Sequence, residues 1–188
     1  MSMKRLALLA PLLLAACAGG ESVTTSTVQA DALPFSVEPS SGSVDMLTSK
    51  RIYDRRRGTE TFVAFVNDRE NKGNLLVYHV NTGPGVLMNL TSAKGQVDRA
   101  MPTEVGHLQR ESSDWQVAGY RTEGWIYAPN DKGVSCARFI TPLERASGYD
   151  NAIVAGFDSA LFGQFCLPGG TLDDSAVQKA LGTIHLRP

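Results

Sequence analysis

Few residues in this chain have types and spacings that suit catalysis. Ser159 lies in residues 156–161, which lack the glycine pattern of a serine-hydrolase nucleophile turn. A triad on Ser159 would need His185, close to the last residue, as its base. Glu104 and His107 form a second candidate pair, suited to general acid–base chemistry. Neither candidate combines a nucleophile, a base and an acid in one motif, so the sequence favours a protein without catalytic activity.

Metal and cofactor chemistry has no support in the sequence. The three histidines are scattered, and Cys136 and Cys166 are too far apart to form a Cys-x-x-Cys pair or half of a zinc site. His79 lies inside the apolar run 75–80, where we expect a strand histidine with a hydrogen-bond partner rather than a ligand. We therefore predict no metal ion and no cofactor.

One group of large aromatic rings is a candidate for binding chemistry. The rings are Trp115, Tyr120, Trp125 and Tyr127. They lie on two predicted strands, 115–120 and 124–128, joined by residues 121–123. Exposed and coplanar rings would form a stacking platform for sugars, whereas burial of alternate residues between a sheet and a helix accounts for the same pattern.

A second candidate surface is strongly basic. Residues 50–57 include Lys50, Arg51 and the consecutive Arg55, Arg56 and Arg57, opposed only by Asp54. Such a cluster suits contact with anionic lipid headgroups, with peptidoglycan carboxylates or with an acidic partner. It equally suits the exposed face of an edge strand, where charge discourages association between sheets.

The N-terminal residues indicate where such a site would act. Lys4 and Arg5 precede an apolar run over residues 6–14, which the small residues Ala15 and Ala16 follow. This order of basic, apolar and small residues is typical of a secretory signal peptide. The apolar run is too short to cross a bilayer, which takes about 20 apolar residues.

The segment Leu14-Ala15-Ala16-Cys17 resembles the lipobox of bacterial lipoproteins. The resemblance implies that cleavage precedes Cys17 and that Cys17 becomes an acylated N-terminus, held in the membrane by two or more acyl chains. Ala18, in place of an aspartate, implies the outer membrane rather than retention at the inner membrane. The inner membrane and the cell surface stay open as locations. The alternative is an ordinary signal peptide with a chance cysteine, although a reactive free thiol is unusual in an exported protein.

Composition fits one exported globular domain. Of 18 Lys and Arg, removal of Lys4 and Arg5 leaves 16 against 19 Asp and Glu, a balance that gives no strong field for nucleic acid. We predict a signal peptide over 1–16, a flexible Ser/Thr/Gly/Pro-rich linker of about 30 Å over 17–45, and a single domain over 46–188. Part of the linker, around Leu33, Phe35 and Val37, has apolar residues that could instead dock on the domain.

Cys136 and Cys166 are the two cysteines that remain once Cys17 is acylated. In an oxidising compartment we expect them to form a disulfide, with two buried free thiols as the alternative. In the chain-entropy model, closing a loop of about 30 residues contributes roughly 3 to 4 kcal/mol.

Apolar runs separated by Gly, Asn and Pro predict an antiparallel sheet of roughly seven strands. The runs are 61–66, 75–80, 86–90, 115–120, 124–128, 134–140, 152–157 and 161–167, with a turn at Asp158-Ser159. A capping box of Thr171 and Asp174 predicts a C-terminal amphipathic helix, followed by Gly182 as a stop. The predicted class is α+β, with one C-terminal helix and room for a second short one. An all-β sandwich or barrel with a peripheral helix is the alternative.

Three hypotheses of function follow. The first is an outer-membrane-anchored lipoprotein, facing the periplasm, that acts as a non-enzymatic accessory or scaffold protein for another envelope protein. The second is a module that binds peptidoglycan or another glycan through the four rings and nearby arginines. The third is a periplasmic hydrolase using Ser159, or the pair of Glu104 and His107. None of the three involves nucleic acid.

Overall fold

The computed structural model describes residues 22–38, 44–69, 72–82, 88–89, 93–145 and 156–187. Cys17 and the predicted signal peptide lie outside these ranges, as do residues 152–155 of one predicted strand. The strands are β1 (Val23–Thr27), β2 (Phe35–Val37), β3 (Val44–Asp54), β4 (Thr59–Asp68), β5 (Gly73–Asn81), β6 (Met88–Asn89), β7 (Leu108–Val117), β8 (Tyr120–Tyr127), β9 (Val134–Arg145), β10 (Gly156–Pro168) and β11 (Ile184–Leu186). The helices are α1 (Ala93–Ala100), α2 (Asp174–Leu181) and a 3-10 turn, η1 (Ala30–Ala32).

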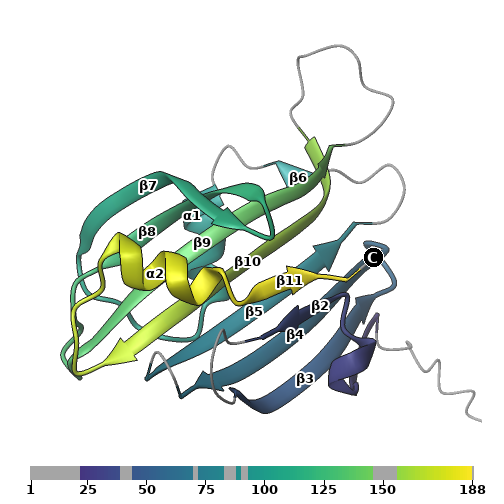
Figure 1. Cartoon of the computed structure of the whole chain (residues 1–188). Coiled ribbons are helices and arrows are strands. Elements are labelled where there is room, and N and C mark those ends of the chain that lie inside the picture. The colour runs from purple at the N-terminus through teal and green to yellow at the C-terminus, as the bar shows by residue number, and fades with distance from the viewer. Residues whose placement is uncertain are drawn as a thin grey trace, which may run out of the picture.

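An antiparallel sheet dominates the described residues (Figure 1). Its strands follow the order β1-β3-β4-β5-β10-β9-β8-β7, and β6 pairs with β10 beside this path. A separate two-stranded sheet is formed by β2 and β11. The predicted predominance of antiparallel strands is confirmed. The sheet is open, because β1 and β7 end it on its two sides.

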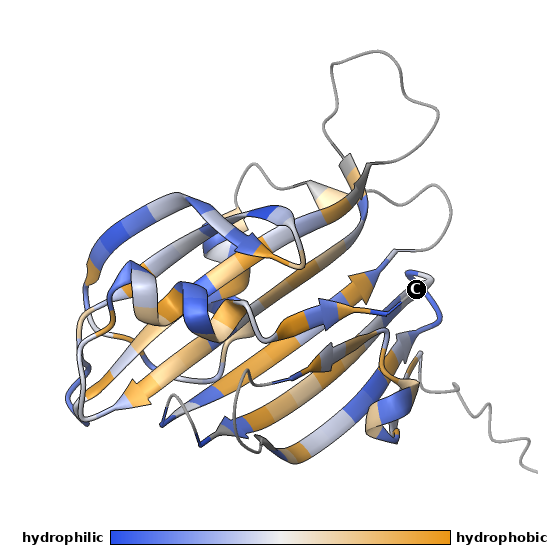
Figure 2. Cartoon of the chain, in the orientation of Figure 1, coloured by the Kyte–Doolittle hydropathy of each residue, from blue (hydrophilic) through white to orange (hydrophobic). Residues whose placement is uncertain are grey.

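Most of the long strands contribute to two cores, because successive side chains point to opposite faces of a sheet. On β9, for example, Phe139 belongs to one core and Ile140 to the other. The first core lies beneath α2 and the pair of β2 and β11, where Figure 2 shows apolar strand residues under a helix with a hydrophilic outer side. The second core includes Val97 of α1, on the opposite face. The two helices therefore cover the two faces.

A disulfide joins the neighbouring strands β9 and β10. Cys136 and Cys166 are direct partners in the strand register, with 4.1 Å between their Cα atoms, and both are buried. The structure thus has the pairing that the sequence predicts. The bond links the strand after the aromatic hairpin to the strand before α2.

The described part of the predicted linker is structured instead. Strand β1 pairs with β3 from Val23 opposite Asp54 to Thr27 opposite Lys50. Leu33, Phe35 and Val37 are buried in the first core. The flexible linker is therefore wrong for residues 22–38, and the docking alternative holds. Burial of these apolar side chains, about 1.5 to 3 kcal/mol each, offsets the entropy lost on ordering the segment.

Two predicted turns fall elsewhere. Asp158 and Ser159 are not in a turn, because β10 continues through them with a bulge while it pairs with β9 and β5. The aromatic hairpin turns at Ala118 and Gly119 rather than at residues 121–123. Both turn residues have positive φ, +51° and +84°, which matches the twist of a two-residue hairpin loop.

Helix α2 begins at a different cap from the one predicted. The N-cap is Asp173, whose carboxylate accepts a hydrogen bond from the backbone N–H of Ala176, rather than Thr171. An aspartate is as good an N-cap as a threonine, and it suits the positive end of the helix. The predicted apolar face is confirmed, since Val177, Ala180 and Leu181 are buried.

Helix α1 carries Asp98, the ion-pair partner of a buried arginine. Arg138 of β9 is only 3% exposed, and its Nη1 donates to Asp98 Oδ1 at 2.7 Å. Lys94 and the hydroxyl of Tyr127 also donate to the Asp98 carboxylate. Burial acts to raise the pKa of Asp98, but the hydrogen bonds from Lys94, Arg138 and Tyr127 prevail and hold it below its usual range. Asp98 is therefore ionised at neutral pH and forms an ion pair with Arg138.

We expect Asp98→Ala to lower the free energy of unfolding by about 2 to 4 kcal/mol, because it leaves the Arg138 guanidinium buried and unpaired. Asp45→Ala is the matched control. It removes an ion pair with Arg69 in which the carboxylate side chain is 38% exposed, and should change the free energy by less than about 1 kcal/mol. Urea unfolding at neutral pH measures both values, and equal losses would contradict the prediction.

The stabilisation that Asp98 provides should also depend on pH. The pKa of Asp98 is lowered in the folded protein, so its contribution is present above the unfolded pKa and is lost as pH falls through the folded pKa. The difference in stability between the wild type and Asp98→Ala should therefore shrink in acid.

Candidate functional site

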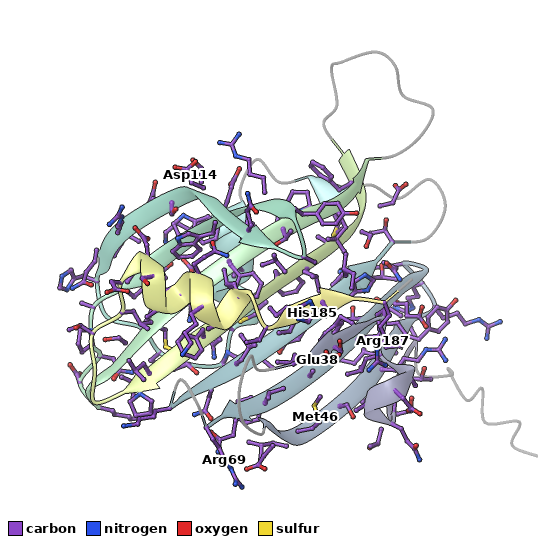
Figure 3. All side chains as sticks on the ribbon, viewed as in Figure 1. Glu38, Met46, Arg69, Asp114, His185 and Arg187 are labelled. Atoms are coloured by element: carbon purple, nitrogen blue, oxygen red, sulfur yellow. A yellow bond between two sulfur atoms is a disulfide. The ribbon has the colours of Figure 1, made fainter. Side chains whose placement is uncertain are left out.

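A cavity of about 420 Å³ lies at the edge of the layer that covers the first core. Its polar lining comes from β5 and the residue after it, from β8 and β10, and from the chain after β11: His79, Asn81, Thr82, Tyr120, Asp158, Ser159 and Arg187. Pro34, Leu143 and Leu186 supply apolar walls. Figure 3 shows His185 and Arg187 along β11 and the residues that follow it, while Asp114 lies away from them on β7. The cavity therefore combines residues from distant parts of the sequence.

Strand register brings His79 and Ser159 together. In the pairing of β5 with β10, His79 lies opposite Leu161, and Ser159 lies opposite Asn81. Residues two positions apart share a face, so His79 and Ser159 are diagonal neighbours on one side of the sheet. The Ser159 hydroxyl is 3.3 Å from His79 Nε2. Both side chains are buried.

His79 is held in apolar surroundings. Its ring is 6% exposed and lies 6.5 Å from the ring of Phe35 and 6.4 Å from that of Phe62. Burial lowers the pKa of His79, and the negative charge of Glu60 opposes this only in part. Nδ1 is buried and has no hydrogen-bond partner among the described residues. The expected strand histidine is thus satisfied at one ring nitrogen only.

A neutral imidazole beside a serine hydroxyl has the geometry of a base and a nucleophile. A catalytic triad also needs an acid on the other ring nitrogen, which holds the tautomer and stabilises the imidazolium. In the described part of the chain no carboxylate bonds to His79 Nδ1. His185, the base that the sequence suggested, is exposed and lies opposite Ser36 of β2. The structure therefore pairs Ser159 with a different histidine and gives it an incomplete set of catalytic groups.

Glu104 and His107 lie in a second cavity, of about 510 Å³. Asn130, Asp131 and Lys132, from the turn between β8 and β9, line it with them. Asn130 donates to the backbone carbonyl of Glu104, and no hydrogen bond joins the Glu104 and His107 side chains in the described residues. Neither residue lines the cavity that holds Ser159, so the two candidate sets do not converge.

Three of the four predicted platform rings are buried, so the stacking platform on the aromatic hairpin is wrong. Trp115, Trp125 and Tyr127 are 3%, 6% and 3% exposed, whereas Tyr120 is 40% exposed. Trp115 packs over Gly124, where a Cβ atom would come within 2.0 Å of its ring, and its indole N–H donates to Asp174 of α2. These rings fill the cores on both faces of the sheet. Only Tyr120 is free for binding, and it lines the first cavity.

The basic residues of 50–57 lie on β3 and in the turn that follows it, beside β1. Lys50 and Arg51 belong to β3, and Arg51 forms an ion pair with Glu60 of β4. Arg55, Arg56 and Arg57 are exposed in the turn between β3 and β4 and are called the basic turn below. Since β1 covers β3, these residues are not on an edge strand as expected.

Sequence reasoning did not identify His79, Asn81, Asp158 and Arg187 as lining one cavity, because no local motif joins them. No group of metal-ligating side chains occurs within the described ranges, and no helix there is long and apolar enough to cross a membrane. No protein-family model, no curated protein and no solved structure matches the chain. Its function must therefore be argued from its own residues.

We expect His79→Gln to reduce the loss of stability in acid. Because burial lowers the pKa of His79, its contribution is present above the unfolded pKa and is lost as pH falls through the folded pKa. The ordinary pKa of a histidine is about 6.5, so the stability that the wild type loses through His79 by pH 5 is at most about 2 kcal/mol. Thermal melts between pH 7 and pH 5 measure it. His107→Gln, at an exposed histidine, is the control, and identical pH profiles for the two variants would contradict the prediction.

Proposed function

We propose that this protein is a lipoprotein of the cell envelope, anchored in the outer membrane through Cys17 and facing the periplasm. In this proposal it is a non-enzymatic accessory protein that binds another envelope protein. The signal-peptide pattern, the lipobox resemblance and the Cys136–Cys166 disulfide support export and anchoring. The incomplete catalytic set around Ser159 supports binding over hydrolysis.

The observation that carries the accessory role is the outer edge of β7, the last strand of the sheet. At Gln116 the side chain of Gln178 from α2 pairs with both backbone groups, donating to the carbonyl and accepting from the N–H. It thus takes the place of a neighbouring strand. Over residues 108–112 no other strand or side chain of the described residues bonds to the backbone groups of this outer edge, although the Arg110 side chain forms an ion pair with Asp174 of α2. A segment of another protein could add here by β-augmentation.

The residues of β7 favour a different protein over a second copy of this chain. The strand carries Arg110, Glu111 and Asp114, and its pairing with β8 has two irregularities. Charges and bulges on an edge suppress association with other sheets unless the partner has matching charges. The β7 edge also lies seven strand spacings, about 33 Å along the sheet, from β1 and the start of the described chain. It is therefore well placed to reach a partner away from the anchor.

We expect a photo-cross-linking residue at Gln109, exposed on β7, to capture one defined envelope protein in cells. The same residue at Lys132, exposed in the turn between β8 and β9, is the control and should capture none. Glu111→Arg should reduce capture severalfold, because it reverses the charge that a partner strand with a matching cation would contact. A Cys17→Ala variant tests the anchor, since it should leave the membrane fraction. Equal capture from both positions would contradict the proposed edge contact.

A second candidate function is glycan binding at the 420 Å³ cavity, and the exposed ring of Tyr120 favours it. A sugar presents an apolar C–H face and a rim of hydroxyl groups. Tyr120 supplies an aromatic surface, and Asn81, Asp158 and Arg187 supply planar polar groups with both donors and acceptors. In the periplasm the ligand of this chemistry is peptidoglycan.

Tyr120→Ala should weaken the binding of soluble peptidoglycan fragments about fivefold to tenfold, because it removes the stacking surface. Tyr53→Ala is the matched control, since Tyr53 is 39% exposed against 40% for Tyr120 but lies on β3, outside the cavity. Titration calorimetry measures both affinities. Wild-type affinity in the Tyr120 variant, or no binding by the wild type, would contradict this second candidate.

A further inference from the structure

The basic turn lies against the first residue of the described chain. The backbone N–H of Arg55 donates to the carbonyl of Ser22 at 2.7 Å, and Val23 lies opposite Asp54 in the strand register. The position of Ser22 is thus fixed next to Arg55, Arg56 and Arg57.

The short distance in sequence from Cys17 to Ser22 keeps the basic turn near the proposed anchor. The five Cα–Cα steps between these residues span at most about 18 Å, and about 12 Å for a flexible chain. The negative potential of an anionic membrane surface decays over about 8 to 10 Å. The turn therefore lies within or close to the range of that potential whenever Cys17 carries its lipid. The inference below rests on the proposed lipid anchor.

The charges of the turn are available to a ligand. Arg55, Arg56 and Arg57 are all exposed, and only Arg57 approaches a carboxylate, that of Asp54 at 3.7 Å. Arg55 and Arg56 form no ion pair with any described residue. The other carboxylate oxygen of Asp54 accepts the backbone N–H groups of Arg56 and Arg57, so Asp54 also fixes the turn itself.

One neighbouring residue can add to this surface. Tyr53, two residues before the turn on β3, is 39% exposed. Tyrosine side chains are enriched at the headgroup level of membranes, where one end of the ring is apolar and the other polar. Guanidinium groups bind phosphate oxygens in a bidentate manner.

We propose that the basic turn is a membrane-docking surface, which binds the anionic phosphate groups of lipid headgroups in the membrane that holds the Cys17 acyl chains. Its position beside the anchor selects the lipid surface over an acidic protein, because no other anionic surface is held there covalently. Docking at this turn fixes the orientation of the domain. The corner of the sheet formed by the start of β1 and the turn between β3 and β4 then lies next to the membrane, and β7 is on the opposite side of the sheet.

The test uses the chain from residue 17 onward with Cys17→Ser, so that binding does not depend on acylation. We expect it to sediment with vesicles that contain phosphatidylglycerol and not with vesicles of phosphatidylcholine alone, and to be released as ionic strength rises. Arg55→Gln with Arg56→Gln and Arg57→Gln should weaken binding about 100-fold, from about fivefold for each cation. Arg99→Gln with Arg121→Gln and Lys132→Gln is the matched control, because it removes the same charge from exposed positions elsewhere.

The outcomes separate the docking surface from the anchor. Equal binding by the two triple variants, with equal melting temperatures, would overturn the docking surface.

Mass spectrometry of the chain from cells tests the anchor independently, by the acyl mass on Cys17. An acylated Cys17 with equal vesicle binding leaves the anchor standing and overturns docking. An unacylated Cys17 overturns the proposed anchor and, with it, the orientation, even where the turn binds vesicles. Binding of the turn to an acidic protein but not to anionic vesicles would also overturn the inference.

Discussion

The guanidinium of Arg138 lies on a central strand and is almost fully buried, and a buried cation must be paired. The Asp98 carboxylate and the Thr103 carbonyl accept from its two terminal nitrogens, so α1 and the residues that follow it are held against the sheet. Tyr127, Lys94 and Arg138 all converge on the one carboxylate, which explains why a short and mostly polar helix is stable there. The opposite face needs no such charge, because α2 and the pair of β2 and β11 cover it with apolar side chains. A polar contact thus holds α1 on one face of the sheet, and an apolar layer holds α2, β2 and β11 on the other.

Helices and the pair of β2 and β11 cover the two faces of the sheet, so a ligand or a partner can bind only where this covering layer ends. The cavity beside His79 forms where β11 stops, and the free part of β7 begins upstream of the point where Gln178 pairs with Gln116. The disulfide lies between β9 and β10, inside the sheet, and keeps these central strands in register. The central strands are therefore cross-linked, and the sites proposed for binding lie around the rim of the sheet.

Sequence reasoning predicted the elements whose burial shows in the pattern and missed those held by polar contacts. Residues 61–66, 75–80 and 134–140 are strands because their apolar runs face two cores, and α2 has its predicted apolar face. Strand β1 and the first half of β7 are almost entirely exposed, so no apolar run marks them. The pair of His79 and Ser159 depends on strand register across 80 residues, which no local pattern encodes. The aromatic hairpin was recognisable, but the burial of Trp115 depends on Gly124 and on Asp174 of a distant helix. Trp125 and Tyr127 are buried in the second core, with Val97 of α1.

The two edges of the sheet are protected in different ways, and the difference bears on orientation. Strand β7 has charged residues, an irregular pairing and the Gln178 side chain. Strand β1 is Val-Thr-Thr-Ser-Thr, with all five residues exposed, uncharged and regularly paired with β3, and such an edge invites association with another sheet. Its protection must come from its surroundings. The basic turn lies at the Val23 end of β1, and in the proposed orientation the membrane lies next to that end of the strand. The shortness of the segment from Cys17 to Ser22, and not the long flexible linker that the composition suggested, is what would bring this edge to the membrane.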